Sequence, residues 1–342
     1  MTRASGWLSR YGVGIALLLI VIIGAITVPG FFTRGNLTTI LLHVSINAIL
    51  ALGMTFVIVT AGIDLSVGSL LALAGVLTAG TLTSSAVLDV AGVGGAVTLA
   101  ILVGIGVGVA AGAFNGAITA WLGVAPFMVT LASMTIARGM ARLITGGVPI
   151  GFPATNDPHF ETKVSALNAL HAFGGGRIPV PGLPRGFPVP ALVMIVLAVL
   201  AAFVLTRTRF GRYVYAVGGN EEAARLAGVP VRAVKLAVYA IAGACAGLAG
   251  VLLTGQLRSG GPDAGMLYEL NAIAAAVIGG ASLFGGIGTA WGAVVGALLI
   301  GVLNNGLDLL GVQSFWQEIV KGVIILLAVL FDVWTKRGTS SA

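Results

Sequence analysis

The feature that most constrains this chain is a succession of apolar stretches, each long enough to cross a lipid bilayer. A spanning α-helix needs about 20 mainly apolar residues, because the hydrocarbon core is about 30 Å thick. Ten such stretches occur, at residues 11–28, 37–60, 66–85, 93–120, 127–145, 189–206, 236–256, 269–284, 290–309 and 315–334. The pattern predicts an all-α polytopic membrane protein, with a single transmembrane domain over residues 1–342 and about ten transmembrane helices.

The composition excludes an ordinary soluble enzyme. Only 8% of the 342 residues are charged, against about 25% in an average soluble domain, and so few charges cannot cover a water-exposed surface. No P-loop, catalytic triad motif or metal-ligand spacing occurs, and Cys245 is the single cysteine. We therefore expect no catalytic residues and no metal site in this chain.

The basic residues favour one orientation. The net charge is +7, and Lys and Arg concentrate in the loops on the side of the two termini, as the positive-inside rule describes for cytoplasmic loops. Because the positive-inside rule accounts for the excess of basic residues, we expect no nucleic-acid partner. We expect cytoplasmic termini, an external loop at 146–188 with a short helix near 159–172, and a cytoplasmic loop at 207–235.

An ungapped internal repeat joins two parts of the chain. Asn47-Ala48-Ile49 recurs as Asn271-Ala272-Ile273, and Gly62-Ile63 and Gly68 match Gly286-Ile287 and Gly292 at the same offset. Because six spans separate the copies, they keep the same membrane orientation, which predicts a parallel repeat. Chance matching in a chain rich in Ala, Gly and Ile is the alternative.

The cytoplasmic loop contains a short helix with its own start and stop signals. Asn220 is a good N-cap, Glu221 and Glu222 occupy the first turn, and Gly228 with Pro230 ends the helix. A helix of this length is not stable alone, so it needs a docking surface. The pattern alone leaves a plain amphipathic linker open.

At these residues the chain resembles the permeases of ABC importers. Glu222-Ala223-Ala224 followed by Gly228 fits their E-A-A-x-x-x-G signature, although the I-x-L-P of the most typical members is missing. Three further segments are similar to the ribose-type sugar permeases: Gly62–Gly68 (GIDLSVG), Phe210–Asn220 (FGRYVYAVGGN) and Leu303–Leu307 (LNNGL). The resemblance covers about residues 10–334 and is weakest in the loop at 146–188.

The resemblance implies a function that is shared among several chains. This chain would be the permease of a bacterial inner-membrane ABC importer for a monosaccharide, a ribose-like pentose or a hexose. An external binding protein would deliver the sugar, and a separate cytoplasmic ATPase would bind ATP and Mg, so that this chain binds no cofactor. A second permease chain, identical or related, would complete the pore. The residues implied in ATPase coupling are Asn220, Glu221, Glu222, Ala223, Ala224 and Gly228.

Polar residues within or between the spans are candidates for the translocation path: Asn47, Asp64, Ser66, Asn115, Asn271, Asn304 and Asn305. An uncharged polyol needs hydrogen-bonding groups, and amides in lipid would be unpaired. Bonds between helices would satisfy the same amides. Asp64 or Ser66 equally suits the N-cap of the third span.

Four charged residues near the outer face are candidates for contact with the binding protein: Arg138, Arg142, Glu318 and Lys321. Snorkelling to the interface or pairing within the bundle is the alternative for all of them.

Three rival functions remain open. An ABC permease for another cargo, such as a nucleoside, a branched amino acid or a furanone signal, fits equally well, because a separate protein largely selects the cargo. A secondary transporter is suggested by the repeat and the broken spans, but the acidic residues Asp64, Glu269 and Asp308 lie near predicted span ends. The third rival, a passive channel, is disfavoured because a channel needs no ATPase-docking helix.

Overall fold

The protein is almost wholly helical over residues 3–337, which the computed structural model describes. Its helices are α1 (Arg3–Thr27), α2 (Arg34–Val59), α3 (Val67–Thr83), α4 (Ser85–Trp121), α5 (Pro126–Thr145), α6 (Phe160–Gly174), α7 (Val189–Arg207), α8 (Arg209–Gly219), α9 (Glu221–Leu226), α10 (Val231–Leu257), α11 (Tyr268–Ile278), α12 (Ala290–Leu309) and α13 (Ser314–Arg337). A two-stranded antiparallel hairpin, β1 (Arg177–Val180) and β2 (Leu183–Pro188), precedes α7.

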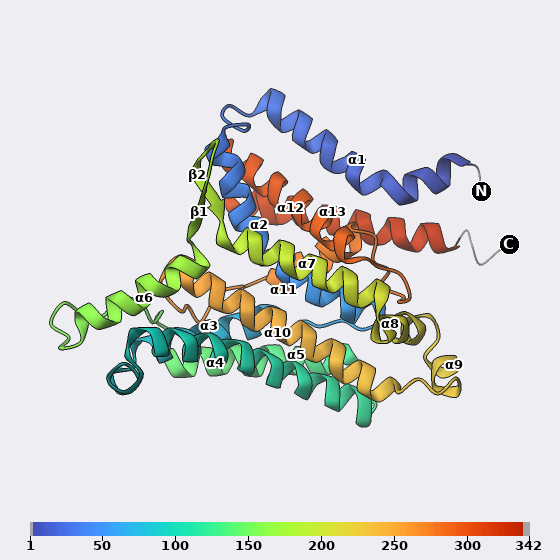
Figure 1. The fold of residues 1–342 in the computed structure, drawn as a ribbon. Helices are drawn as coiled ribbons and strands as arrows, with labels where there is room; N and C mark the ends of the chain where they lie inside the picture. The colour runs from blue at the N-terminus through green and yellow to red at the C-terminus, as the bar shows by residue number, and fades with distance from the viewer. Residues whose placement is uncertain (1–2, 338–342) are drawn as a thin grey trace.

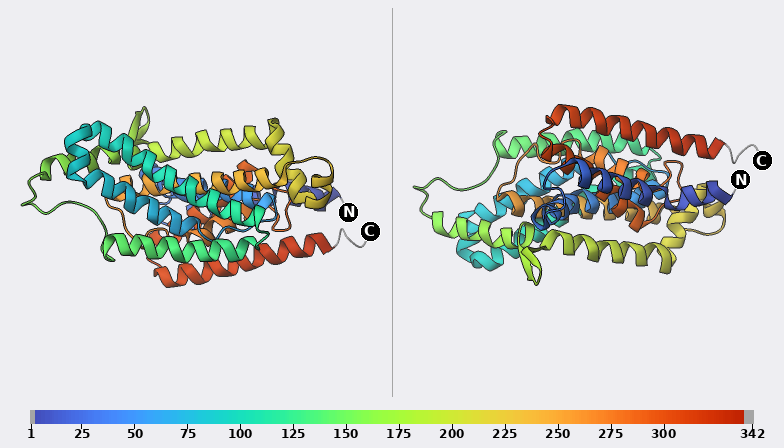
Figure 2. Two further views of the ribbon diagram at one scale, coloured as in Figure 1. Left: turned by 90° about the horizontal axis from the view of Figure 1, so that it is seen from below. Right: turned by 90° about the horizontal axis from the view of Figure 1, so that it is seen from above.

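The long helices run along one axis of an elongated bundle (Figures 1 and 2). α6 and the hairpin lie at one end of the bundle, which we name the α6 end. α8 and α9 lie at the opposite end, which we name the α9 end, together with the start of α1 and the finish of α13 (Figure 1). The two large loops of the sequence therefore belong to opposite ends of the molecule.

Ten of the helices coincide with the ten predicted spans, so the predicted fold class is confirmed. Six of them are long and apolar enough to cross a membrane by length and composition: α2, α4, α5, α7, α10 and α12. α1, α3 and α11 contribute shorter apolar segments. In α4 a break at Gly92, with φ of 63°, separates the first turns from the part that matches the predicted span.

The eighth span is shorter than predicted. The hydrophobic pattern predicts residues 269–284, but α11 ends at Ile278 and an irregular loop follows, with positive φ at Gly280, Gly285 and Gly286. Eleven helical residues cover about 16 Å, roughly half of the hydrocarbon thickness. Irregular residues 258–267 precede α11: they pass beside α5, where Arg138 contacts Pro262, and beside α3, where Gly265 packs on Gly68.

The repeat corresponds to two helix–loop–helix units. The first consists of α2, residues 60–66 and α3, and the second of α11, residues 279–289 and α12. α2 packs against both helices of the second unit, and the Gly286 N–H donates a 2.8 Å hydrogen bond to the Val59 carbonyl. The first helix of the second unit ends earlier than an ungapped register places it, because the glycines after Ile278 break it.

Glycine determines how closely α4 and α10 approach. Gly104, Gly108, Gly112 and Gly116 recur every fourth residue on one face of α4 and are buried. A Cβ at Gly108 would collide with the backbone of Gly243 and Gly247 on α10. Small residues allow this contact, and close packing is a main source of helix association where lipid is as apolar as the side chains.

The Gly108→Ala variant tests this contact. We expect a lower thermal midpoint in detergent, because overpacking costs about 1–3 kcal/mol. Gly106→Ala is the matched control on the same helix, since a Cβ there meets nothing within 4 Å. The control should keep or raise the midpoint, because Ala is better than Gly in a helix by about 1 kcal/mol. Equal midpoints in the two variants would contradict the close contact.

Candidate functional site

α9 is an independently capped helix that projects from the bundle. The Asn220 side chain accepts a 2.9 Å hydrogen bond from the Ala223 N–H, and Gly228 leaves the helix with φ of +81°. Both sequence signals therefore act as predicted. Lys235 of α10 forms a 2.7 Å ion pair with Glu221, which ties α9 to the next long helix.

The exposed face of α9 contains an apolar residue that the sequence analysis missed. Leu226 is 84% exposed, and Glu222 is exposed beside it, with Arg225 3.4 Å from its carboxylate. Ala224 is the buried side chain of the helix. An exposed leucine on a helix outside the spans is a candidate contact for another protein. The sequence signal that could have identified Leu226 is its position inside the E-A-A-x-x-x-G segment.

α8 was also missed, although its pattern is present in the sequence. Phe210, Tyr213, Val214 and Val217 have the i, i+3, i+4, i+7 spacing of an amphipathic helix. Thr208 caps it by accepting a 3.1 Å hydrogen bond from the Gly211 N–H. The predicted loop at 207–235 is therefore two helices joined at Asn220, which is the C-cap of α8 and the N-cap of α9.

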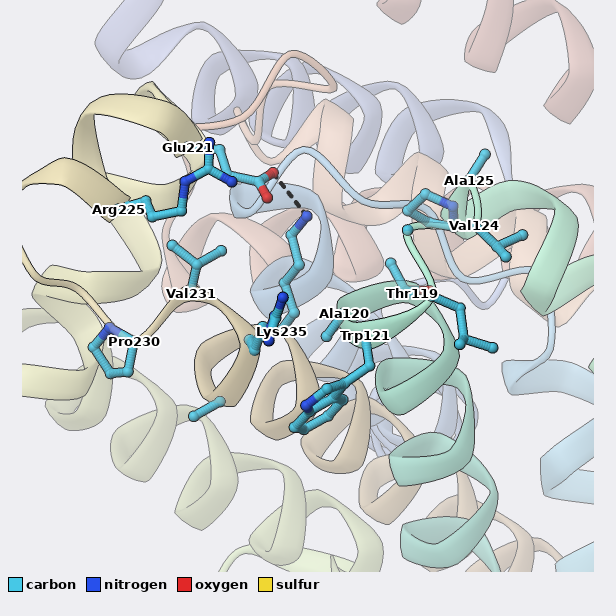
Figure 3. A pocket seen from close by; sticks show the side chains of 15 residues that line it. Thr119, Ala120, Trp121, Val124, Ala125, Glu221, Arg225, Pro230, Val231 and Lys235 are labelled. Carbon is cyan, nitrogen blue, oxygen red and sulfur yellow. Dashed lines mark ion pairs between the residues drawn. The ribbon is translucent and has the colours of Figure 1, made fainter.

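A cleft of about 810 Å³ separates α9 from the connection between α4 and α5 (Figure 3). Trp121, Leu122 and Val124 line one wall, and Glu221, Arg225, Pro230, Arg232 and Lys235 line the other. Basic side chains outnumber the single carboxylate, and Glu221 is already paired with Lys235. The cleft is thus an open, basic depression at the α9 end.

A second set of polar residues is buried at the break between α2 and α3. Asp64 Oδ1 accepts hydrogen bonds from the Ser66 N–H at 2.8 Å and from the Ser66 hydroxyl at 2.5 Å. Asn115 of α4 donates to the Ser66 hydroxyl oxygen at 3.0 Å, and Ser133 of α5 donates to the Asn115 carbonyl oxygen. One chain of hydrogen bonds therefore joins the loop, α4 and α5.

This set corrects the prediction that the side chain of Asp64 or Ser66 caps α3. Ser66 occupies the N-cap position of α3 but makes no side-chain cap bond, and Asp64 bonds Ser66 itself rather than the first turn of α3. Asp64 is fully buried, and Asn115, which donates to the same Ser66 hydroxyl, sits six residues from the end of α4, which is about 9 Å along the helix. Among the residues that the structure describes, Asp64 Oδ2 has no hydrogen-bond partner.

The remaining candidates for the path do not form one site. Asn305 and Asn36 donate to each other's side-chain carbonyl at 2.9 and 2.8 Å, which joins α12 to α2. Asn271 lines a small cavity with Lys321 of α13. The carbonyl oxygens of Asn47 and Asn304 are buried without a partner in the described part of the chain. Only Asp64, Ser66 and Asn115 are in mutual contact.

The four charged residues predicted near the outer face have different surroundings. Arg138 donates to the carbonyls of Pro262 and Ala264 at 2.7 and 2.8 Å, and Arg142 pairs with Asp263 at 2.7 Å. Both arginines thus hold the segment that leads into α11. Lys321 borders the Asn271 cavity, whereas Glu318 is exposed.

Ionisable groups do not gather into a metal site in the part of the chain that the structure describes. Over residues 3–337 no three His, Cys, Asp or Glu side chains lie close enough to hold a metal ion. The arrangement can dock a protein at the α9 end and present hydrogen-bonding groups inside the bundle.

The comparisons with known proteins agree with one another. Residues 36–329 match the family model described as branched-chain amino acid transport system / permease component. The chain is 45% identical to the ribose import permease protein of Bacillus subtilis, over 96% of this chain and 94% of that protein. It is 44% identical to the ribose import permease protein of Escherichia coli K12, over 95% and 94%. The D-allose transport system permease protein of that strain is 38% identical, over 94% and 91%. No solved structure matches the chain significantly.

The bonded chain from Ser133 to Asp64 predicts a coupling between two residues on different helices. In a double-mutant cycle with Asn115→Ala and Ser133→Ala, the losses in the free energy of unfolding should fall short of additivity by about 0.5–3 kcal/mol. Thr135→Ala is the control on α5, because that hydroxyl donates only to Leu131 of its own helix. The losses in the free energy of unfolding from Asn115→Ala and Thr135→Ala should add. If the losses for Asn115→Ala and Ser133→Ala add as well, the bonded chain is refuted.

Proposed function

We propose a function from the premise that this chain belongs to the family of branched-chain amino acid transport system permease components. In this proposal the chain is the membrane-spanning permease of an ABC importer for a monosaccharide. Ribose is the sugar whose transport should be tested first. The similarity to ribose import permeases over nearly the whole of both chains carries the proposal. The exposed, capped α9 supports it, because such a helix needs a docking partner.

The partner at the α9 end is a cytoplasmic ATPase. Glu222 and Leu226 provide its contact on α9, and the basic cleft beside them adds Arg225 and Arg232. Apolar and charged side chains next to a depression suit a protein interface. ATP and Mg bind to that ATPase, and this chain contributes no cofactor site and no catalytic group.

The opposite end faces the external binding protein. Arg142 and Glu318 are exposed there and are available to a partner. Arg138 serves instead to hold residues 262–264, and Lys321 faces the Asn271 cavity. We therefore confine the proposed contact with the binding protein to the two exposed residues.

The translocation path runs past the buried polar residues of the repeat. Asp64, Ser66 and Asn115 provide one cluster, and Asn47, Asn271 and Asn304 provide further hydrogen-bonding groups. Asn305 stays in the proposed path, although its amide pairs with Asn36. A second permease chain, identical or related, completes the pore, because importers of this kind contain two permease domains and this chain has one.

A rival cargo is the main alternative. The xylose transport system permease protein of Escherichia coli K12 is also 38% identical, and the family description names branched-chain amino acids. Competition for uptake among ribose, xylose, allose and leucine distinguishes these cargoes. A secondary transporter is the second alternative, and it would move its substrate without ATP.

Reconstitution tests the function and the docking face together. Proteoliposomes that contain this chain, a P-loop ATPase and a secreted ribose-binding protein from the same organism should take up ribose only with ATP inside. Leu226→Glu and Glu222→Ala should abolish uptake and lower ATPase co-purification by about 30-fold, the effect of losing an interface hot spot.

Glu318→Ala is the matched control, since it removes an exposed glutamate at the α6 end. It should leave ATPase co-purification unchanged. Undiminished assembly in the two α9 variants would remove α9 as the docking element, and ribose uptake without ATP would remove the ABC mechanism.

The proposed orientation places the α9 end and both termini in the cytoplasm of a bacterial cell with the protein in its inner membrane. In a Cys245→Ala background, Ser165→Cys on α6 should react with an impermeant thiol reagent from outside. Leu226→Cys on α9 should react only after the membrane is opened. Both side chains are exposed, so labelling of both from one side would refute the orientation.

A further inference from the structure

α8 is in contact with both repeat units: with Val59, the last residue of α2, and with the loop at residues 279–289. A Cβ at Gly218 would collide with the Val59 carbonyl and the Gly286 N–H, so three backbone segments meet there with no side chain between them. The same Gly286 N–H donates to the Val59 carbonyl at 2.8 Å. The end of α8 is therefore packed on the joint between residues 60–66 and residues 279–289.

Tyr215 makes a second connection from α8. Its hydroxyl donates a 2.7 Å hydrogen bond to the Gly288 carbonyl. Burial raises the pKa of this hydroxyl, so it keeps its proton and remains a donor at neutral pH. Tyr215 thus fixes the end of the second loop next to the start of α12.

The path of contacts continues at both sides of this joint. Towards the α9 end, α8 and α9 share Asn220 as their common cap, so no flexible linker separates them. On the inner side, residues 60–66 lead to Asp64 and Ser66 and their bonded chain to Asn115, while residues 279–289 join α11 to α12. Figure 1 shows α8 between α9 and the bundle.

From this arrangement we propose that α8 transmits a displacement of α9 to both loops at once, through Gly218 and Tyr215, and that Tyr215 is a positioning residue for the second loop. The inference rests on the proposed function, because the displacement comes from the docked ATPase. Close backbone contact transmits movement well, since packed groups of low compressibility cannot absorb it. The two repeat units would then change conformation together.

Tyr215→Phe tests the proposal in the reconstituted complex of permease, ATPase and binding protein. It removes the hydroxyl and keeps the ring. The number of ribose molecules imported per ATP hydrolysed should fall about fivefold, the factor that corresponds to one ordinary hydrogen bond. Tyr213→Phe is the matched control: the ring is also partly buried on α8, and its hydroxyl makes no hydrogen bond among the described residues. That control should keep the ratio of the unaltered complex.

A second pair of variants tests the proposal independently, in case Tyr215→Phe disturbs folding. Gly218→Ala should lower the ratio of ribose to ATP, whereas Gly219→Ala should not, because a Cβ at Gly219 meets nothing within 4 Å. Thermal stability and ATPase co-purification are measured for all four variants. If Tyr215→Phe and Gly218→Ala lower thermal stability but keep the ratio of ribose to ATP, the contacts are merely structural and the proposal is overturned. A normal ratio of ribose to ATP in all four variants would also overturn it.

The unaltered complex separates this inference from the function on which it depends. If that complex shows no ATP-dependent ribose uptake, the proposed function fails. If it imports ribose and the Tyr215→Phe and Gly218→Ala variants keep its ratio, only the transmission through α8 fails.

Discussion

Hydrocarbon offers no hydrogen-bond partner to irregular backbone, and this chain has two irregular segments packed among its helices. The irregular backbone at residues 60–66 and 258–267 is therefore tolerable only where other parts of the protein satisfy it. Thr130 and Tyr239 donate to the Ile63 carbonyl at 3.3 and 3.5 Å, and Arg138 donates to two carbonyls of the second segment. The long helices α5 and α10 are thus the hydrogen-bonding environment for the breaks, and their placement determines where polar groups can lie inside the bundle.

Close packing holds those long helices in place. The glycine face of α4 brings its backbone against that of α10, and Gly250 of α10 packs in turn on α3 near Leu71. Glycine lowers intrinsic helix stability, but in a bilayer its small size permits the contacts that hold helices together. The same property explains the joint at Gly218, where any larger residue would separate α8 from the loops. Glycine thus has two roles in this chain, in packing and in the connection between the α9 end and the interior.

Much of the fold could be predicted from the sequence, because span length and local capping are properties of contiguous residues. The ten spans and the Asn220 cap are of this kind. The end of α11 could not be predicted, because hydropathy does not register the positive φ of Gly280. Partnerships between distant residues, such as Arg142 with Asp263 or Asn115 with Ser66, depend on the packing of helices and have no signal in one sequence. For that reason the predicted path residues, which are buried or half-buried, separate into several local environments.

The position of α1 has a consequence for how the protein is made. α1 packs chiefly against α12, and its side chains at Ile15, Leu18, Leu19 and Ile22 remain exposed in the finished bundle. Ribosomes deliver helices to the membrane in chain order, so α1 enters before α12, which follows only after the helices from α2 to α11. Until then α1 has to persist as a solitary helix surrounded by lipid. A transmembrane helix satisfies its own backbone, and lipid is as good a solvent as protein for leucine and isoleucine, so the wait costs little. The docking of α1 can therefore come late in biogenesis, after the helices between it and α12 have entered the membrane.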